Sequence, residues 1–355
     1  DGSRIRTLDS NGNVFTLYGQ SLDFGDGGLA LNARFNDLTS FDQPSGNIIT
    51  LYDYGMSKFR EFSIGGTIAN IAGDGSVNTP NTTSLAINQG NYAWGRFWFK
   101  SDPATGNIIM PQQTKTMKLN RSTGMWENLY GGGGTLYSSA DGLLGSAISF
   151  AYQYWGGIIG FNGSQVLMPA ANWNGTQVID ATFKLYSITD GTQTHLAGVL
   201  GNALLNGTIC ADGSAIANCY VPPNSSISVP SGPLVIPSYW DAPNNRWIIM
   251  DSGTRVTSFP IGGNISTLTT VSARPYAFTY RKSGADEVIY FCHRAAQRLR
   301  KKNFTTGVET SLTWPITTMK CSGYNLIYNS TRDSLIFTYT QNNLQGVAEY
   351  LNPGI

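Results

Sequence analysis

The chain has 355 residues, of which only 13% are charged, while 41% are hydrophobic and include 8 Trp, 18 Tyr and 16 Phe. This apolar content suffices for a sizeable core and excludes a disordered chain. The formal net charge of +1 excludes the basic field typical of nucleic-acid-binding and membrane-surface proteins. No stretch approaches the ~20 apolar residues of a membrane span, so we expect no direct membrane insertion. Few charges with many glycines and aromatics are typical of all-β proteins that work outside the cytoplasm.

Short runs that alternate apolar and polar residues, bounded by Gly, Asn, Asp and Pro, follow one another from end to end, and helical periodicity is almost absent. One element, a basic–apolar strand followed by a turn with Gly and a second strand, recurs along the chain. Its copies are Arg4-Ile5-Arg6, Lys58-Phe59-Arg60, Met117-Lys118-Leu119, Phe183-Lys184-Leu185, Arg255-Val256 and Arg298-Leu299-Arg300. Two more strands precede these copies, for example residues 38–41 and 47–52. Four strands per repeat are the content of a β-propeller blade, so we predict an all-β propeller.

The N-terminal repeat carries the most specific pattern. Its basic–apolar strand is followed by a strand that ends Leu17-Tyr18-Gly19, by the loop Gly25-Asp26-Gly27-Gly28, and by an Asp before the next basic strand. The Asp-Gly pair recurs at Asp74-Gly75, Asp141-Gly142 and Asp212-Gly213. In these features the chain resembles the NHL-repeat β-propellers, in a divergent extracellular form, closely in the N-terminal repeats and by strand pattern alone after about residue 230. The shared motifs are structural, because the glycines permit positive φ and the Asp caps its own turn.

The resemblance implies a single propeller domain over residues 1–355. Whole blades fit between residues 35 and 315, and a last blade combines C-terminal strands with residues 13–19, so that strands from both termini close the ring. We predict six four-stranded blades. Seven is the alternative, because residues 4–8 and 347–351 both look like the third strand of one blade. The segment at about 202–233 is too long for a blade connection and is predicted to be an insertion loop.

Four cysteines are present, and they are Cys210, Cys219, Cys292 and Cys321. Cys210 and Cys219 flank a short loop, whereas Cys292 and Cys321 lie in neighbouring strand-like runs. Four cysteines allow three pairings, among which the sequence does not choose. We expect at least one disulfide and therefore an extracellular or cell-surface location, with the periplasm as the alternative compartment. The other interpretation is four buried thiols.

Patterns for catalysis and metal binding are scarce. The chain has no Gly-x-Ser-x-Gly elbow before a helix and only two histidines, His195 and His293. Some NHL propellers are metal-dependent lyases, but their zinc site needs several histidines, so the resemblance carries no such site to this chain. We therefore predict no catalytic residue, no metal and no cofactor. The basic run at residues 298–302 is interpreted as a solvated blade edge, and we expect no nucleic-acid partner.

The candidate binding site is the mouth of the central channel, which the first strand of each blade lines. These strands begin with aromatic or polar residues, and basic residues or tryptophans stand near several of them. The predicted ligand-binding residues are Tyr92, Tyr152, Tyr239, Tyr276, Tyr324, Arg34, Arg274, Lys320, Trp94, Trp155 and Trp240. Tyrosines and tryptophans that stack, together with guanidinium groups, suit a glycan or a peptide. The alternative is that these aromatic side chains pack between blades.

The sequence therefore predicts a non-catalytic recognition module of a secreted or cell-surface protein, which binds a glycan or protein ligand on another surface, as in adhesion. The chain begins abruptly within a repeat, so we expect it to be part of a longer chain. Two alternatives stay open: a structural spacer propeller in a larger surface protein, and a hydrolase or lyase on the same scaffold, for which paired carboxylates would be the candidates. The aromatic residues favour recognition over the spacer, and the shortage of histidines counts against the enzyme.

Overall fold

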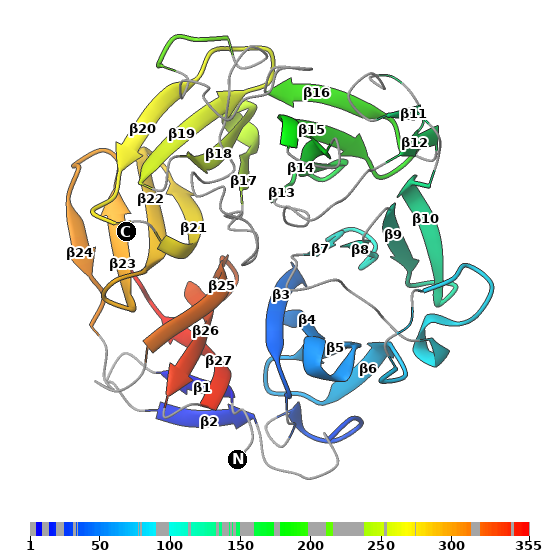
Figure 1. Ribbon diagram of the computed structural model, residues 1–355. Helices are drawn as coiled ribbons and strands as arrows, with labels where there is room; N and C mark the ends of the chain where they lie inside the picture. The colour runs from blue at the N-terminus through cyan, green and yellow to red at the C-terminus, as the bar shows by residue number, and fades with distance from the viewer. Residues whose placement is uncertain are drawn as a thin grey trace. The chain divides into compact units, whose positions relative to one another are not determined.

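A computed structural model gives the fold as all-β, a six-bladed β-propeller, which confirms the predicted fold class (Figure 1). The structure describes residues 5–8, 14–18, 25–30, 33, 35–76, 78, 80–89, 99–112, 115–132, 135–136, 142, 144, 147–149, 160–173, 178–197, 211–215, 238–251, 254–273, 275–313, 320–341 and 344–354. Within these segments, no helix has the length and hydropathy to cross a membrane.

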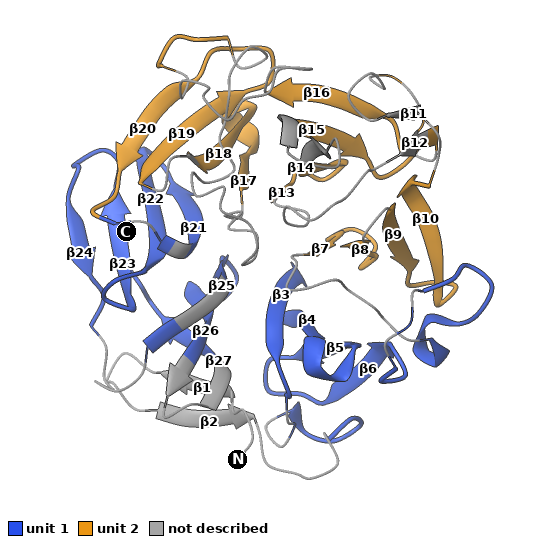
Figure 2. Ribbon diagram, in the orientation of Figure 1, with its two compact units in different colours: residues 1–92, 273–355 blue, residues 93–272 orange. Residues whose placement is uncertain are grey.

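The chain divides into two compact units, residues 1–92 with 273–355 and residues 93–272 (Figure 2). The first unit contains the sheets β3 (Leu38–Ser45), β4 (Ile48–Asp53), β5 (Lys58–Ser63), β6 (Ile68–Ala72); β21 (Pro275–Ser283), β22 (Asp286–His293), β23 (Arg298–Asn303), β24 (Glu309–Ser311); and β25 (Lys320–Asn329), β26 (Ser334–Gln341), β27 (Leu344–Leu351) with β1 (Ile5–Leu8) and β2 (Val14–Tyr18). Two 3-10 turns, η2 (Tyr54–Met56) and η3 (Ala86–Asn88), also belong to it.

In the part of the chain that the structure describes, the second unit contains three four-stranded sheets, a short two-stranded sheet and a 3-10 turn. Their strands are β7 (Lys100–Ser101), β8 (Ile108–Pro111), β9 (Lys115–Asn120), β10 (Met125–Gly131); β13 (Gly160–Phe161), β14 (Gln165–Trp173), β15 (Val178–Ser187), β16 (Gln193–Ala197); β17 (Tyr239–Asp241), β18 (Arg246–Asp251), β19 (Arg255–Pro260), β20 (Ser266–Thr270); and β11 (Thr135–Leu136) with β12 (Ile148–Ser149). The 3-10 turn η8 (Ala242–Asn244) joins β17 to β18.

The blade formed by the chain ends has five strands, in the order β2-β1-β27-β26-β25. β1 pairs in parallel with β27, and β2 lies antiparallel on the outer side of β1. Closure by strands from both termini is thereby confirmed. The two segments that both looked like a third strand are accommodated by an extra strand, because β1 takes the fourth place and moves residues 14–18 to the fifth.

The hydrophobic cores of the first unit lie between neighbouring blades. Ile336 and Val347 of the five-stranded blade share one buried cluster with residues of β3, β4 and β6. Leu326 and Phe337 of the same blade share another with Tyr290 and further residues of β21–β24. Each blade buries its apolar faces only against its neighbours, which is why the repeats fold together rather than singly.

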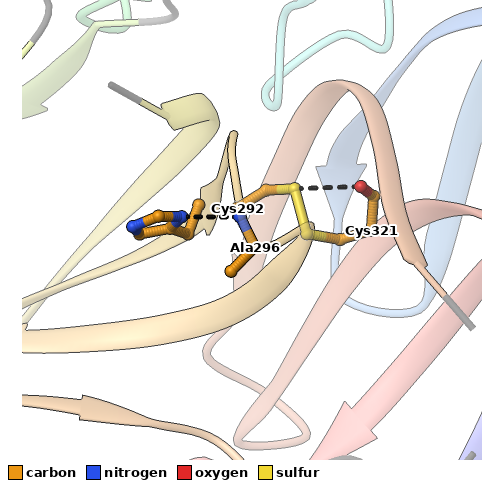
Figure 3. The surroundings of a disulfide bond; sticks show 4 residues. Cys292, Ala296 and Cys321 are labelled. Carbon is orange, nitrogen blue, oxygen red and sulfur yellow. Dashed lines mark hydrogen bonds between the residues drawn. A yellow bond between two sulfur atoms is a disulfide. The ribbon is translucent and has the colours of Figure 1, made fainter. Parts of the chain in front are cut away.

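A disulfide joins two of these blades. It links Cys292 of β22 to Cys321 of β25 across 29 residues of chain (Figure 3). Both cysteines are buried within the core between the two blades. The prediction of at least one disulfide is confirmed, whereas Cys210 and Cys219 lie outside the described residues.

The Asp-Gly loop of the first repeat docks on the edge of its blade. The Gly27 N–H donates to the Ile68 carbonyl at 2.8 Å, so the loop continues the pairing of β6. Next to it, the Asp26 carboxylate accepts a hydrogen bond from Arg60 Nε at 2.8 Å and lies 3.6 Å from Lys58 Nζ. The basic residues of β5 thus hold the loop that carries the Asp.

The same arrangement recurs in the second unit. The Gly213 N–H donates to the Ile265 carbonyl at 2.9 Å, and the Asp212 carboxylate meets Arg255 Nη2 at 3.3 Å and the Thr267 hydroxyl at 2.9 Å. The alternation of basic and apolar residues in the third strand therefore has a physical reason here, because one residue fills the core and the next holds the Asp-Gly loop. Residues 211–215 are the described part of the predicted insertion loop at about 202–233.

A buried carboxylate ends β4. Asp53 is 0% exposed, and its side chain accepts the N–H groups of Asn36 and Asp37 at 3.1 and 3.2 Å. The Arg60 guanidinium, 1% exposed, lies 3.8 Å away and also binds Asp26. Burial raises the pKa of Asp53 to about 6, against the opposing effect of these hydrogen bonds and of Arg60. Arg60 is therefore the cation that compensates a carboxylate with no access to water.

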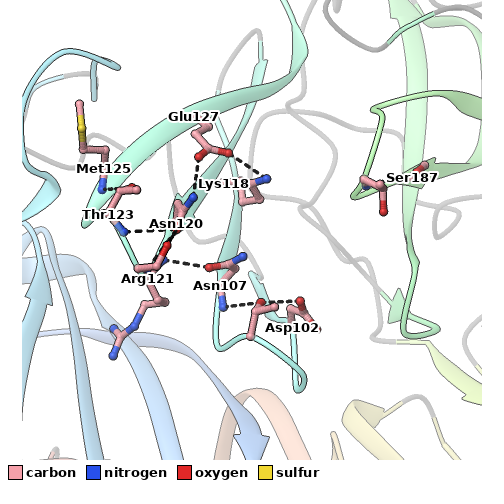
Figure 4. A network of polar contacts seen from close by, with 12 residues as sticks. Asp102, Asn107, Lys118, Asn120, Arg121, Thr123, Met125, Glu127 and Ser187 are labelled. Carbon is pink, nitrogen blue, oxygen red and sulfur yellow. Dashed lines mark hydrogen bonds and ion pairs between the residues drawn. The ribbon is translucent and has the colours of Figure 1, made fainter.

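The turns of the second unit are closed by polar side chains, as the one between β9 and β10 illustrates (Figure 4). Asn120 Oδ1 accepts the Ser122 N–H at 3.0 Å, and Asn120 Nδ2 donates to Glu127 at 2.8 Å. Glu127 in turn pairs with Lys118 Nζ at 2.8 Å, across the same hairpin. Asparagine favours such turns because its side chain replaces a main-chain hydrogen bond.

Candidate functional site

The structure describes the predicted channel-mouth residues in part. Tyr276 lies near the start of β21, as expected, whereas β25 begins earlier than expected, with the exposed Lys320, and Tyr324 lies within it. For Tyr276 and Tyr324 only the backbone is described. The predicted residues outside the described part of the chain are Arg34, Tyr92, Trp94, Tyr152, Trp155 and Arg274. A ligand site at the mouth therefore stays a prediction.

Tyr239 and Trp240 form the start of β17, and both are half-buried. Trp240 pairs with Trp247 of β18, and the two ring centroids are 5.1 Å apart. Trp247 is completely buried, so one face of Trp240 packs on the core. Tyr239 lies on the opposite face of the sheet, because side chains alternate along a strand.

Trp247 also constrains the neighbouring blade of the second unit, which contains β13. A Cβ at Gly160 of β13 would lie 2.4 Å from Cζ3 of Trp247 and 3.2 Å from the Ser238 carbonyl oxygen. We expect Gly160→Ala to lower the free energy of unfolding by about 1–3 kcal/mol, measured by urea denaturation, because the site has no room for a methyl group. The double variant Gly160→Ala/Trp247→Leu should cost less than the sum of the single variants, and strict additivity would contradict the contact.

Aromatic and charged side chains from two blades of the first unit meet near the ends of β21 and β25. The rings of Tyr290 and Tyr328 are stacked, with centroids 6.2 Å apart and an interplanar angle of 18°. The guanidinium carbon of Arg281 lies 4.8 Å from the centroid of Tyr328, and its Nη1 is 3.0 Å from Asp333. The Tyr328 hydroxyl donates to Asp333 at 2.8 Å. Arg281, Tyr290, Tyr328 and Asp333 are called the Tyr290 cluster below.

Strand register places these residues together. Tyr290 pairs with Thr279, and side chains two apart on a strand share a face, so Arg281 stands on the same face of the sheet as Tyr290. That face packs against the five-stranded blade, where the Tyr328 N–H donates to the Thr279 hydroxyl at 3.1 Å. The cluster is therefore assembled by the contact between two blades and not by one segment of sequence.

The phenols of the cluster act as hydrogen-bond donors at neutral pH. Burial raises the pKa of Tyr290. Burial, followed by the hydrogen bond to Asp333, raises the pKa of Tyr328 to about 12. Both hydroxyl groups consequently keep their protons throughout the physiological range.

A main-chain segment of the same chain lies on the cluster. The carbonyl oxygen of Gly354 accepts from the Tyr290 hydroxyl and from Arg281 Nη1, the latter at 3.5 Å. The Asn352 N–H donates to the Asp333 carbonyl at 2.8 Å. Pro353 is buried, although Asn352 and Gly354 on either side of it are exposed. The cluster thus already binds a short piece of polypeptide.

No protein-family model and no curated protein matches the chain. Among solved structures, a structural genomics protein of unknown function from Bacteroides thetaiotaomicron aligns with a TM-score of 0.51 at 11% identity, over 88% of this chain and 69% of that chain. A streptogramin B lyase aligns with a TM-score of 0.50 at 13% identity, over 99% of this chain and 87% of that chain. The similarity is one of fold alone. It supports the β-propeller and leaves membership of the NHL family an interpretation.

The two histidines occupy ordinary positions in the blades. Nδ1 of His293 accepts the Ala296 N–H at 3.0 Å and so caps the turn between β22 and β23 (Figure 3). His195 lies in β16 opposite the buried Lys184. Among the residues that the structure describes, no three His, Cys, Asp or Glu side chains gather where they could hold a metal ion.

The residues of the Tyr290 cluster were not among those predicted from the sequence. The predicted binding residues stand at or near the start of the first strand of each blade, whereas Arg281 and Tyr328 stand toward the other ends of β21 and β25. The signal that could have found Arg281 is the basic pair that it forms with Lys282 at the end of an otherwise uncharged strand.

Proposed function

We propose that this chain is a non-catalytic recognition module of a secreted or cell-surface protein, with a role in adhesion to a glycan or protein ligand. The observation that carries the proposal is the Tyr290 cluster, in which a guanidinium group and a buried phenol converge on one carbonyl oxygen. Stacked tyrosines beside an arginine bind both sugars and peptides, through ring contacts and directed hydrogen bonds. The aromatic residues predicted at the channel mouth are the second candidate surface for the same function.

The disulfide supports the proposed location. A buried bond between Cys292 and Cys321 persists in oxidising compartments and is rare in the cytosol. An extracellular or surface-exposed propeller that presents aromatic and cationic side chains fits recognition of another surface.

A glycan array and a surface-binding screen of the purified chain test this function. We expect selective binding that falls at least ~10-fold in Arg281→Ala, since truncation of a hot-spot residue costs about 2 kcal/mol or more and about 1.4 kcal/mol corresponds to tenfold. Lys302→Ala is the matched control, because Lys302 lies in the same blade and outside the Tyr290 cluster.

The double variant Tyr239→Ala/Tyr276→Ala distinguishes the two surfaces. Loss of binding in this variant, with circular dichroism unchanged, would locate the ligand at the predicted channel mouth. If the wild-type chain binds nothing in the glycan array or in the surface-binding screen, the recognition function is wrong and the structural spacer role is favoured.

A further inference from the structure

We propose that the Tyr290 cluster is a peptide-binding site, which captures a main-chain carbonyl directly after a proline, and that residues 352–354 occupy it as an internal ligand. This inference rests on the proposed function, because it names the class of partner for the same site.

The first argument is the kind of contact that holds the segment. The described hydrogen bonds between it and the cluster use its main-chain atoms, namely the Asn352 N–H and the Gly354 carbonyl oxygen. Such contacts do not depend on the side chains of the bound segment. Another polypeptide with the same local conformation can therefore make them.

The second argument is the proline. Pro353 is buried, and its ring fixes its own φ, so the bound conformation costs little entropy. Its neighbours Asn352 and Gly354 have φ of +49° and +70°, which gives the segment a tight, defined shape. A segment whose main-chain shape is fixed in this way loses little conformational entropy when it binds.

The third argument is electrostatic. Arg281 Nη1 and the Tyr290 hydroxyl both donate to the Gly354 carbonyl, and Lys301 Nζ lies 3.3 Å from where a Cβ of Gly354 would stand. The Asp333 side chain pairs with Arg281 and so compensates the positive charge of Arg281. Donors for a carbonyl on one side and the Asp333 carbonyl for an N–H on the other match the two polarities of a peptide backbone.

The internal segment competes with any external peptide. A tethered segment has an effective concentration in the millimolar range, which lowers the apparent affinity of a ligand added from solution. Weakening the hold on residues 352–354 should therefore raise the affinity for a peptide partner.

The test uses the full chain and a fluorescently labelled, acetylated peptide with the sequence of residues 350–355, followed by fluorescence anisotropy. Gly354→Val strains a residue with φ of +70° and crowds Lys301, so it displaces the internal segment. We expect this variant to bind the peptide at least ~10-fold more tightly than the wild-type chain does. Gly307→Val is the matched control. Gly307 has φ of +68° in the turn between β23 and β24, with open space around it, so this variant should bind the peptide as the wild-type chain does.

The hydroxyl donor is tested in the Gly354→Val background. Adding Tyr290→Phe should weaken peptide binding about 5- to 10-fold, the effect of one lost hydrogen bond, whereas Tyr280→Phe on the opposite face of β21 should not. A peptide with Ala in place of the residue corresponding to Pro353 should bind more weakly. Absence of binding to Gly354→Val, or binding that ignores Tyr290→Phe, would overturn the proposal.

The outcomes separate this inference from the proposed function. If the surface screen or the glycan array finds a ligand whose binding depends on Arg281, while the peptide does not bind, the peptide assignment is wrong and the recognition function stands. Absence of binding in all three assays overturns both.

Discussion

The double variant Cys292→Ala/Cys321→Ala is expected to lose about 3–4 kcal/mol of unfolding free energy, measured by urea denaturation under oxidising conditions. The bond closes a loop of 29 residues, and opening such a loop restores chain entropy to the unfolded state. Both cysteines also lie in the core between two blades, so the bond adds a covalent link to elements that otherwise contact each other through packing and hydrogen bonds.

Reduction provides the control for this prediction. Reductant should lower the urea concentration at which the wild-type chain unfolds by more than it does for the double variant, because the double variant has no bond between positions 292 and 321 to lose. A variant within about 1 kcal/mol of the wild-type chain would show that the blades hold together without the bond.

The second large effect is expected from Arg60→Met, which keeps an unbranched side-chain stem and removes the guanidinium charge. We expect it to lower the free energy of unfolding by about 3–5 kcal/mol at pH 8, because Asp53 stays buried without its compensating cation. Lys58→Met is the matched control: Lys58 is partly exposed at 19%, and its pair with Asp26 at 3.6 Å should contribute less than about 1 kcal/mol. Equal losses in the two variants would contradict the role of Arg60.

The effect of Arg60→Met should depend on pH in a definite direction. The pKa of Asp53 is raised from 3.8 to about 6 by burial, so the stability that its protonated form contributes is complete below about pH 4 and is lost as the pH rises through 6. Without Arg60 the Asp53 side chain is still buried but has no cation beside it, so its charged form is less stable than in the wild-type chain. The difference in stability between wild type and Arg60→Met should therefore grow from pH 5 to pH 8, and a constant difference would exclude Asp53 as its origin.

The fold was largely predictable because the strands of a blade are specified by residue patterns within each short segment. The alternation at Lys58-Phe59-Arg60 and Arg298-Leu299-Arg300 predicts third strands, and β5 and β23 occupy those positions. The place of β1 was not predictable in this way. Its parallel pairing with β27 joins the two ends of the chain, and no local pattern specifies a contact of that range.

The candidate site was less predictable for a related reason. The sequence indicates where strands begin: Tyr276 lies near the start of β21, as expected, whereas Tyr324, which was expected near the start of its strand, lies in the middle of β25. The Tyr290 cluster depends instead on which faces of two blades meet, on the register between them and on a segment that returns from residue 352. The same missing information left the disulfide pairing open, because Cys292 and Cys321 approach only once β22 and β25 pack together.

The parallel pairing of β1 with β27 has a mechanical consequence. A force that draws residue 5 and residue 351 apart along the strands pulls two parallel strands from opposite ends, which is the geometry of shear. The pairs that would bear it are Arg6 with Ala348, Thr7 with Glu349 and Leu8 with Tyr350. Hydrogen bonds loaded in shear share the tension and break together, whereas bonds peeled from one end break in turn. The five-stranded blade therefore acts as a clamp that resists separation of β1 from β27 under traction along the strands.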